Sequence, residues 1–124
     1  MNVVALDGNL VKDAELKVLP GTEGEFSVLE FTIAWTARRA KQDGQIDERA
    51  QFIDCVVYND HGYAEGLDKS GYMKKGKRVG VEAKLKYDSW KGDDGASRSK
   101  IRLDVKHVDF LTPKSDDQEP TDDE

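Results

Sequence analysis

Alternation of apolar and polar residues is the feature that most constrains how this chain can fold. Four segments repeat with a period of two: residues 27–37, 51–58, 78–90 and 100–108. Because successive side chains of a β-strand point to opposite faces, each segment predicts a strand with one covered face. A fifth strand is predicted over residues 2–12, where the run Asp7-Gly8-Asn9 indicates a bulge or kink.

One helix is expected among these strands. Residues 61–75 form the only stretch with helical spacing, and the side chains that could face a core there are Tyr63 or Ala64, Leu67 and Tyr72. Gly66 and Gly71 each cost the helix about 1 kcal/mol relative to Ala, so it should be short and held by packing. The element order β-β-β-α-β-β predicts an all-β protein, a five-stranded OB-fold barrel with one short helix between strands 3 and 4. A ferredoxin-like fold needs a second helix, which the sequence does not offer.

The charge of the chain is concentrated near its C-terminus. The 124 residues carry a net charge of -6, which by itself argues against a polyanionic partner. Residues 113–124, however, hold six acidic residues and one Lys, so residues 1–112 are nearly neutral. The same segment has no aliphatic or aromatic side chain that could offset the entropy of ordering. We therefore predict one OB-fold domain over residues 1–112 and a disordered acidic tail over residues 113–124.

Several classes of protein are excluded by what the sequence lacks. Cys55 is the only cysteine, so no internal disulfide can form and a reducing, cytoplasmic location is expected. One Cys and two His cannot build a structural zinc site, and we expect no metal or cofactor. No apolar run approaches the roughly 20 residues of a membrane span. The sequence has neither a GxSxG nucleophile motif nor a glycine-rich loop before a helix, so we expect no enzymatic activity.

Three aromatic rings fall outside the predicted core. Phe52, Tyr58 and Trp90 lie opposite the aliphatic residues of their strands, where stability alone favours polar side chains. Large apolar rings in such positions indicate a partner, although they could also cover a barrel end or a subunit interface. Unpaired nucleobases stack on rings of this kind with about 1 to 3 kcal/mol per base.

Basic residues accompany the three rings. Lys86 shares the face of Trp90, and Arg38 and Arg39 follow the second predicted strand. Lys75 belongs to a basic cluster at the end of the predicted helix, where cations usually complement the helix dipole but can also contact phosphate. Cations interleaved with flat rings suit single-stranded nucleic acid, so we expect these four side chains to meet its backbone while the rings stack on bases.

Alternation assigns three further side chains to the core. Trp35 continues the face of Phe31 and Ile33, unless a bulge near the end of the strand turns it outward. Tyr87 and Cys55 also fall on inward faces.

The sequence also resembles a known family. The shared motifs, in order, are Gly8-Asn9-Leu10 with Asp13 and Glu15, Phe31-Thr32-Ile33-Ala34, residues 52–58, Ala64-Glu65, Tyr72-Met73-Lys74-Lys75-Gly76, Val81-Glu82 and Trp90. This ordered set covers residues 1–111 and is similar to bacterial-type single-stranded DNA-binding proteins. The resemblance implies an OB-fold, a homotetramer without catalytic activity, and binding of single-stranded DNA with little sequence preference. It further implies a nucleoid-associated role in replication, recombination and repair, with base stacking on Phe52, Tyr58 and Trp90.

Three features depart from the family pattern. Arg38 and Arg39 stand where the family usually has a further stacking tryptophan, so one platform is missing or replaced by guanidinium stacking. Asp54 and Asp88 stand where a basic residue is common, which should weaken phosphate binding. The acidic tail is short and lacks the hydrophobic tip that partner proteins grip, so replication or repair proteins remain partners without an evident binding site. These departures suit a phage-encoded protein, a divergent paralogue, or a shortened form of a longer chain.

Two other functions fit parts of the pattern. The rings could be buried between subunits of an OB-fold interaction or structural module. A cold-shock-like RNA-binding protein fits less well, because the aromatic-rich RNA motifs are missing. If DNA is the ligand, the near-neutral body predicts a weaker salt dependence than a strongly basic groove has, since fewer counterions are released.

Overall fold

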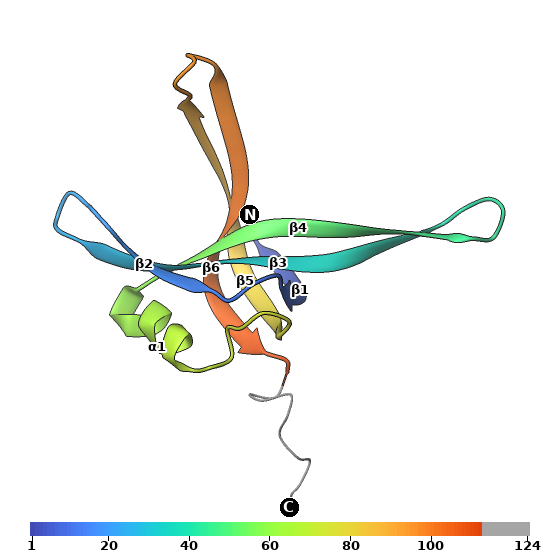
Figure 1. Ribbon diagram of the computed structural model, residues 1–124, viewed down its shortest axis with the longest axis horizontal. Coiled ribbons are helices and arrows are strands. Elements are labelled where there is room, and N and C mark those ends of the chain that lie inside the picture. The colour runs from blue at the N-terminus through green and yellow to red at the C-terminus, as the bar shows by residue number, and fades with distance from the viewer. Residues whose placement is uncertain (113–124) are drawn as a thin grey trace, which may run out of the picture.

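Residues 1–112 fold into six strands and one short helix (Figure 1). These are the residues that the computed structural model describes. The strands are β1 (Val4–Leu10), β2 (Glu15–Leu19), β3 (Phe26–Ala40), β4 (Ile46–Tyr58), β5 (Arg78–Lys91) and β6 (Ser97–Phe110). A 3₁₀ turn, η1 (Asp60–Gly62), leads into the helix α1 (Tyr63–Lys69). The predicted acidic tail lies outside the described residues. Within residues 1–112, no helix has the length and apolar character needed to cross a bilayer.

Five of the strands close into a barrel. Hydrogen-bonded neighbours follow the order β1-β5-β6-β4-β3, and β1 also pairs with β3, at Asn9–Ala34 and Leu10–Ile33, which completes the circle. The β4–β6 pair is parallel and the others are antiparallel. Helix α1 follows the third strand of the barrel and precedes the fourth. The predicted OB-fold barrel, with five strands and one short helix between strands 3 and 4, is confirmed.

Strand β2 is absent from the sequence prediction. It continues the chain beyond β1 and pairs with β3 alone, from Glu15–Glu30 to Leu19–Phe26. Four of its five side chains are exposed. Polar and apolar residues alternate in Glu15-Leu16-Lys17-Val18, but all four are exposed, so the strand lacks the alternation of burial that marks the other strands.

The barrel closes at a glycine. The sequence predicts a bulge or kink at Asp7-Gly8-Asn9, but the register of β1 with β5 is continuous from Val4–Ala83 to Asn9–Arg78. A Cβ atom on Gly8 would lie 2.5 Å from the carbonyl oxygen of Ala34 in β3. The glycine is needed because the backbones of β1 and β3 approach closely here. A glycine inside a strand can mark such a close approach as well as a bulge.

The barrel interior holds most of the side chains that alternation places there. The buried set is Leu10, Leu29, Phe31, Ile33, Cys55, Val57, Val79, Val81, Ala83, Leu103, Val105 and Val108. Helix α1 packs against β2, β3 and β4 and buries Ala64 and Leu67, as predicted. Tyr72 is half-buried and stacks on Phe110 of β6, with ring centroids 4.3 Å apart.

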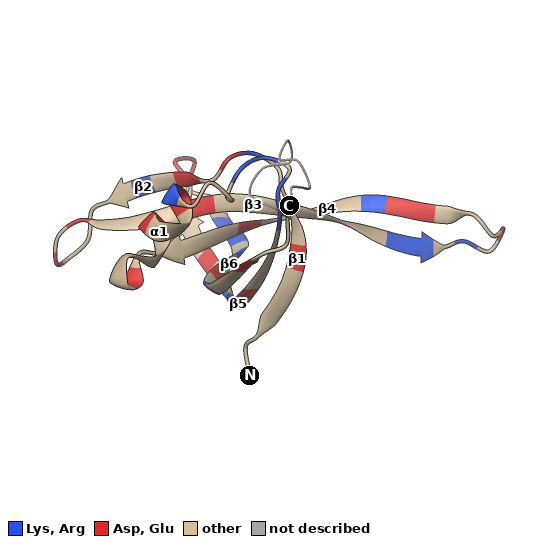
Figure 2. Ribbon diagram, turned by 90° about the horizontal axis from the view of Figure 1, so that it is seen from below, with Lys and Arg blue, Asp and Glu red and all other residues tan. Residues whose placement is uncertain are grey.

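Two hairpins extend past the barrel as arms (Figure 1). The β3–β4 arm turns at residues 41–45 and the β5–β6 arm at residues 92–96. β3 and β4 are longer than alternation predicts, because their pairing continues as far as Ala40–Ile46. Along the β3–β4 arm, basic and acidic residues face each other, with Arg38 opposite Glu48 and Arg39 opposite Asp47 (Figure 2).

The arms explain why one core prediction is wrong. Tyr87, which alternation places in the core, is 66% exposed, and Leu85 and Ile101 near it are also exposed. These side chains continue the core face of β5 and β6, but the two strands have already left the barrel at this height. Trp35 is half-buried and pairs with Gln51 in unbroken register, so no bulge in the described β3–β4 ladder turns it outward.

Candidate nucleic-acid interface

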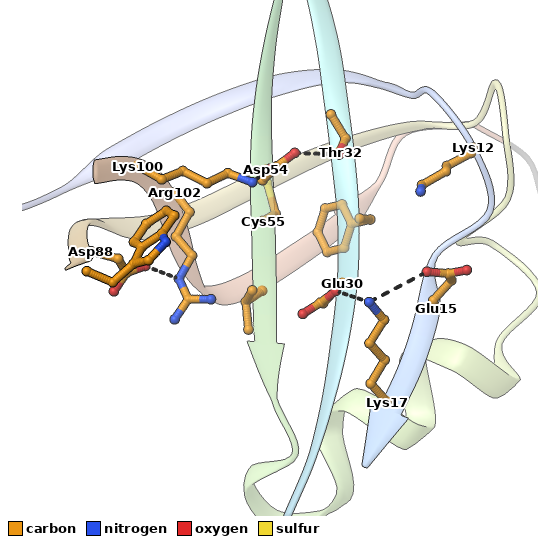
Figure 3. Close-up of a pocket in the computed structure, with 13 residues that line it drawn as sticks. Lys12, Glu15, Lys17, Glu30, Thr32, Asp54, Cys55, Asp88, Lys100 and Arg102 are labelled. Carbon is orange, nitrogen blue, oxygen red and sulfur yellow. Dashed lines mark hydrogen bonds and ion pairs between the residues drawn. The ribbon is translucent and has the colours of Figure 1, made fainter. Parts of the chain in front are cut away.

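A groove of about 380 Å³ crosses the outside of the barrel over β3 and β4 (Figure 3). One side comes from β2 and the bend before it, and the other from β5 and β6 at the base of their arm. Val56 of β4 and Phe31 of β3 are buried and contribute to its floor. The groove is therefore assembled from strands of both halves of the chain.

Of the three predicted rings, Trp90 lines this groove, and Phe52 and Tyr58 lie on β4 beyond its lining residues. By alternation, Phe52 and Tyr58 lie on the same face of β4 as the groove residues Asp54 and Val56. Six strand positions separate the two rings by about 20 Å, so they flank the groove along β4. Trp90 lines the groove from β5. Phe52 is 63% exposed and Trp90 48% exposed, whereas Tyr58 is half-buried.

A fourth ring, Phe26, joins the Tyr58 end of this surface. The two rings stack with centroids 6.1 Å apart and planes 14° from parallel. Phe26 is not among the residues predicted from the sequence, because it stands directly after the loop and before the clear alternation of β3. Extending that alternation backward from Val28, which pairs with Tyr58, would have placed it on the same face.

Two of the predicted basic residues lie on the groove side of their strands. Lys86 shares its face of β5 with Trp90 and lies toward the barrel from it. Arg38 lies on the same face of β3 as the groove residue Thr32, about 20 Å farther out on the arm. Its guanidinium forms an ion pair with Glu48, with 2.8 Å between Nε and Oε2.

The other two predicted basic residues are placed less directly. By alternation, Arg39 points to the opposite side of the β3–β4 arm, where it lines a separate hollow near the hairpin tip. Lys75 is exposed in the loop before β5, and its backbone N–H donates a 2.9 Å hydrogen bond to Asp13 Oδ1. Because Asp13 follows the groove residue Lys12, Lys75 lies near that end of the groove.

Four basic residues that line the groove are missing from the sequence prediction: Lys12, Lys17, Lys100 and Arg102. Lys100 and Arg102 alternate with apolar residues of β6, and this signal could have placed them on the outer face. Lys17 of β2 alternates with Leu16 and Val18 in the same way, whereas Lys12 lies in the bend before β2 and has no comparable signal.

Ion pairs between neighbouring strands line both sides of the groove (Figure 3). The Lys17 ammonium of β2 lies 2.7 Å from the Glu30 carboxylate of β3 and 3.9 Å from that of Glu15. On the other side, Nε of Arg102 in β6 lies 3.0 Å from Oδ2 of Asp88 in β5. With four basic and four acidic side chains in its lining, the groove has no net charge.

Asp54 connects three strands within the groove. Its Oδ1 accepts a 2.7 Å hydrogen bond from the Thr32 hydroxyl of β3, and its Oδ2 contacts the Lys100 ammonium of β6. The hydrogen bonds from Lys100 and then from Thr32 hold the pKa of Asp54 below its ordinary value. The hydrogen bond to Glu30 likewise raises the pKa of Lys17. The charges of both ion pairs therefore persist at neutral pH.

The groove offers little for metal or nucleophile chemistry. In the part of the chain that the structure describes, no three His, Cys, Asp or Glu side chains are grouped to hold a metal ion. Cys55 lies beneath the groove, where burial raises the pKa of its thiol to about 12. Such a thiol remains protonated and packs as a small core side chain.

The sequence of the chain is similar to those of known single-stranded DNA-binding proteins. Residues 1–111 match the Single-strand binding protein family. The chain is 38% identical to a single-stranded DNA-binding protein of Borreliella burgdorferi over 116 residues, which cover 93% of this chain and 72% of that protein. It is also 38% identical to single-stranded DNA-binding protein 3 of Clostridium acetobutylicum over 111 residues, covering 90% and 71% of the two chains.

Solved structures share the fold at lower sequence identity. A Plasmodium falciparum SSB in complex with ssDNA superposes with a TM-score of 0.77 and 21% identity, covering 90% of this chain and 95% of that one. A deletion mutant of the single-stranded DNA-binding protein from Thermus aquaticus gives a TM-score of 0.73 and 22% identity, covering 91% and 51%. From the match over nearly all of its described residues, the chain belongs to the single-strand binding protein family.

Proposed function

We propose that this protein binds single-stranded DNA with little sequence preference and protects it during replication, recombination and repair. The observation that carries the proposal is the exposure of two rings at an open groove, with Trp90 in its lining and Phe52 beside it on β4. Rings in this position have no role in the barrel core, and unpaired bases offer flat partners for them. Stacking tolerates any base because every base has a π-face, and it contributes about 1 to 3 kcal/mol per base.

In the proposed complex, bases stack on Phe52, Trp90 and Tyr58, the last supported by Phe26. The backbone follows the outer faces of β4 and β5, within reach of Lys86 and, farther along the β3–β4 arm, of Arg38, whereas Arg39 points to the other side of that arm. Lys75 meets the strand at the end of the groove near the bend before β2. Residues 1–112 thus form the DNA-binding body, and the acidic tail competes for its basic residues when DNA is absent.

We further propose that the protein assembles as a homotetramer in the cytoplasm, associated with the nucleoid. Support for subunit contacts comes from the apolar face of the β5–β6 arm opposite Trp90, where Leu85, Tyr87 and Ile101 are exposed. Replication or repair proteins are further partners. A strand longer than one groove then passes from one subunit to the next, since one OB fold covers only about 4 to 16 nucleotides.

Quenching of tryptophan fluorescence by oligo-dT tests the proposal. Stacking on Trp90 predicts strong quenching that is largely lost in Trp90→Ala, with the fluorescence of Trp35 as an internal reference. Duplex DNA of equal length should quench far less, and RNA of the same sequence should not be preferred. If the rings instead lie between subunits, oligo-dT leaves the fluorescence unchanged and Trp90→Ala alters the oligomer size in gel filtration.

A further inference from the structure

Resting on the proposed function, we propose that Asp54 is a specificity-determining residue that keeps DNA phosphates out of the centre of the groove. It does so by occupying Lys100 with a carboxylate, so that the groove selects a strand through its bases more than through its backbone.

Asp54 is held in place from both sides. One carboxylate oxygen accepts the 2.7 Å hydrogen bond from Thr32, and the other contacts the Lys100 ammonium. These partners belong to β3 and β6, the strands on either side of β4. The carboxylate therefore cannot move aside without losing a bond to one of them.

A carboxylate and a phosphate compete for the same donors. Both are oxyanions that bind ammonium groups through charge-assisted hydrogen bonds. A phosphate that approaches Lys100 must displace Asp54 or share the ammonium with a fixed negative charge close by. Lys12 lies near enough for its charge to lower the pKa of Asp54, so the same carboxylate also offsets this second cation.

On each side of the groove, another ion pair neutralises a basic side chain. Lys17 is paired with Glu30, and Arg102 with Asp88. The rings, by contrast, remain exposed beside these paired charges. Asp54 stands out because it lies on the same face of β4 as Phe52, two positions away, and therefore beside the path proposed for the strand.

The Asp54→Asn variant tests this role while keeping the shape of the side chain. The amide oxygen still accepts from Thr32, but Lys100 is released to bind phosphate. We expect several-fold tighter binding of oligo-dT at low salt. The plot of log affinity against log salt should steepen by about 0.7, the increment for one additional phosphate contact on a single strand. An oligo-dT with uncharged methylphosphonate linkages should bind wild type and variant equally well.

Asp7→Asn is the matched control. Asp7 is an exposed carboxylate paired with Arg78 at 2.6 Å, and it lines a different hollow on the β1 side of the barrel. The control removes the same charge and also releases one basic partner. It should leave the salt slope for oligo-dT unchanged.

Lys100→Met provides a test that does not require the Asp54 variant. In the wild-type background, Lys100→Met should hardly change the salt slope. In the Asp54→Asn background, it should abolish the tighter binding and the steeper salt slope that Asp54→Asn produces. A slope that becomes shallower by about 0.7 in the single Lys100→Met variant would show that Lys100 already binds phosphate, and would overturn the proposal. Weaker binding by Asp54→Asn, or equal steepening by Asp7→Asn, would overturn it as well. Absence of quenching in the wild type would refute the proposed function itself, and this role of Asp54 with it.

Discussion

Phe26 lies diagonally across the β3–β4 ladder from Tyr58, and the two rings stack, because Val28 is the residue directly opposite Tyr58. Diagonal pairs of this kind are within reach of aromatic side chains in antiparallel sheets. Phe26 therefore orients a ring that flanks the groove, although it comes from a segment just outside the predicted strand.

Replacing Phe26 by alanine should weaken binding of single-stranded DNA. An aromatic pair contributes about 0.5 to 1.5 kcal/mol beyond its buried area, so an affinity loss of roughly two- to tenfold is expected if Tyr58 loses its orientation. Fluorescence titration with oligo-dT measures this loss. Leu111→Ala, which truncates an exposed side chain in the separate hollow on the β1 side, is the control. Equal affinity of the Phe26 variant and the wild type would mean that Tyr58 is oriented by other contacts.

Two Gly→Ala substitutions should have opposite effects on stability. At Gly8 the new methyl group would lie 2.5 Å from the backbone oxygen of Ala34, which cannot move without opening the β1–β3 contact. We expect a loss of about 1 to 3 kcal/mol in the free energy of unfolding. At Gly66, inside α1, the methyl group would meet nothing within 4 Å apart from its chain neighbours and the backbone of its own helix, and a gain of about 0.5 to 1 kcal/mol is expected. Urea unfolding of both variants compares them, and a Gly8→Ala variant as stable as the wild type contradicts the close approach.

The Cys55 thiol should resist alkylation in the folded protein. Burial, with a smaller contribution from the Asp54 charge, raises its pKa to about 12, so only about one molecule in ten thousand carries a thiolate at about pH 8. Iodoacetamide should therefore modify urea-unfolded protein much faster than native protein, as followed by mass spectrometry. Rapid modification of the native form would indicate that the groove floor opens.

The same pKa shift predicts a loss of stability at high pH. Because the folded-state pKa lies above the unfolded value near 9, the protonated thiol favours the folded state fully below about pH 9. This contribution is lost as the pH rises toward 12. Between about pH 9 and about pH 11, Cys55→Ala should therefore lose less stability than the wild type, as measured by urea unfolding. Parallel losses in the two proteins would place the cause in other groups.

Asp54 should make a stability contribution of the opposite pH dependence. Its folded-state pKa is lowered by Lys100 and Thr32, so its contribution is complete above the ordinary aspartate range and is lost as the pH falls through and below it. The stability difference between wild type and Asp54→Asn should therefore shrink between about pH 6 and about pH 3. Thr32→Val, which removes one of the two bonds, should show part of this effect. A difference that stays constant with pH would show that the carboxylate is not preferentially stabilised in its charged form.

The sequence is sufficient for the barrel because alternation is a local property that each strand expresses by itself. Leu29, Phe31 and Ile33 are buried as this period requires. The same period fails at Tyr87, since it identifies the inward face of β5 but not the height at which the strand leaves the barrel. That height depends on the lengths of the neighbouring strands, which no short segment contains.

The groove is predictable only in part, for a related reason. Phe52 and Trp90 can be singled out because each is out of place within its own strand. The contact between Asp54 and Lys100, in contrast, requires β4 and β6 to lie side by side. These residues are far apart in the sequence, and their charges alone do not indicate that they meet.

The length of the two arms does not depend on how the barrel folds. Facing strands in the β3–β4 arm satisfy each other's backbone hydrogen bonds, from Trp35–Gln51 to Ala40–Ile46, without help from the barrel interior. An arm can therefore lengthen or shorten during evolution while the barrel stays the same. Such changes must come two residues per strand, because a single step would turn every later side chain to the other side. The reach of the molecule beyond its barrel is in this way an adjustable dimension of the fold.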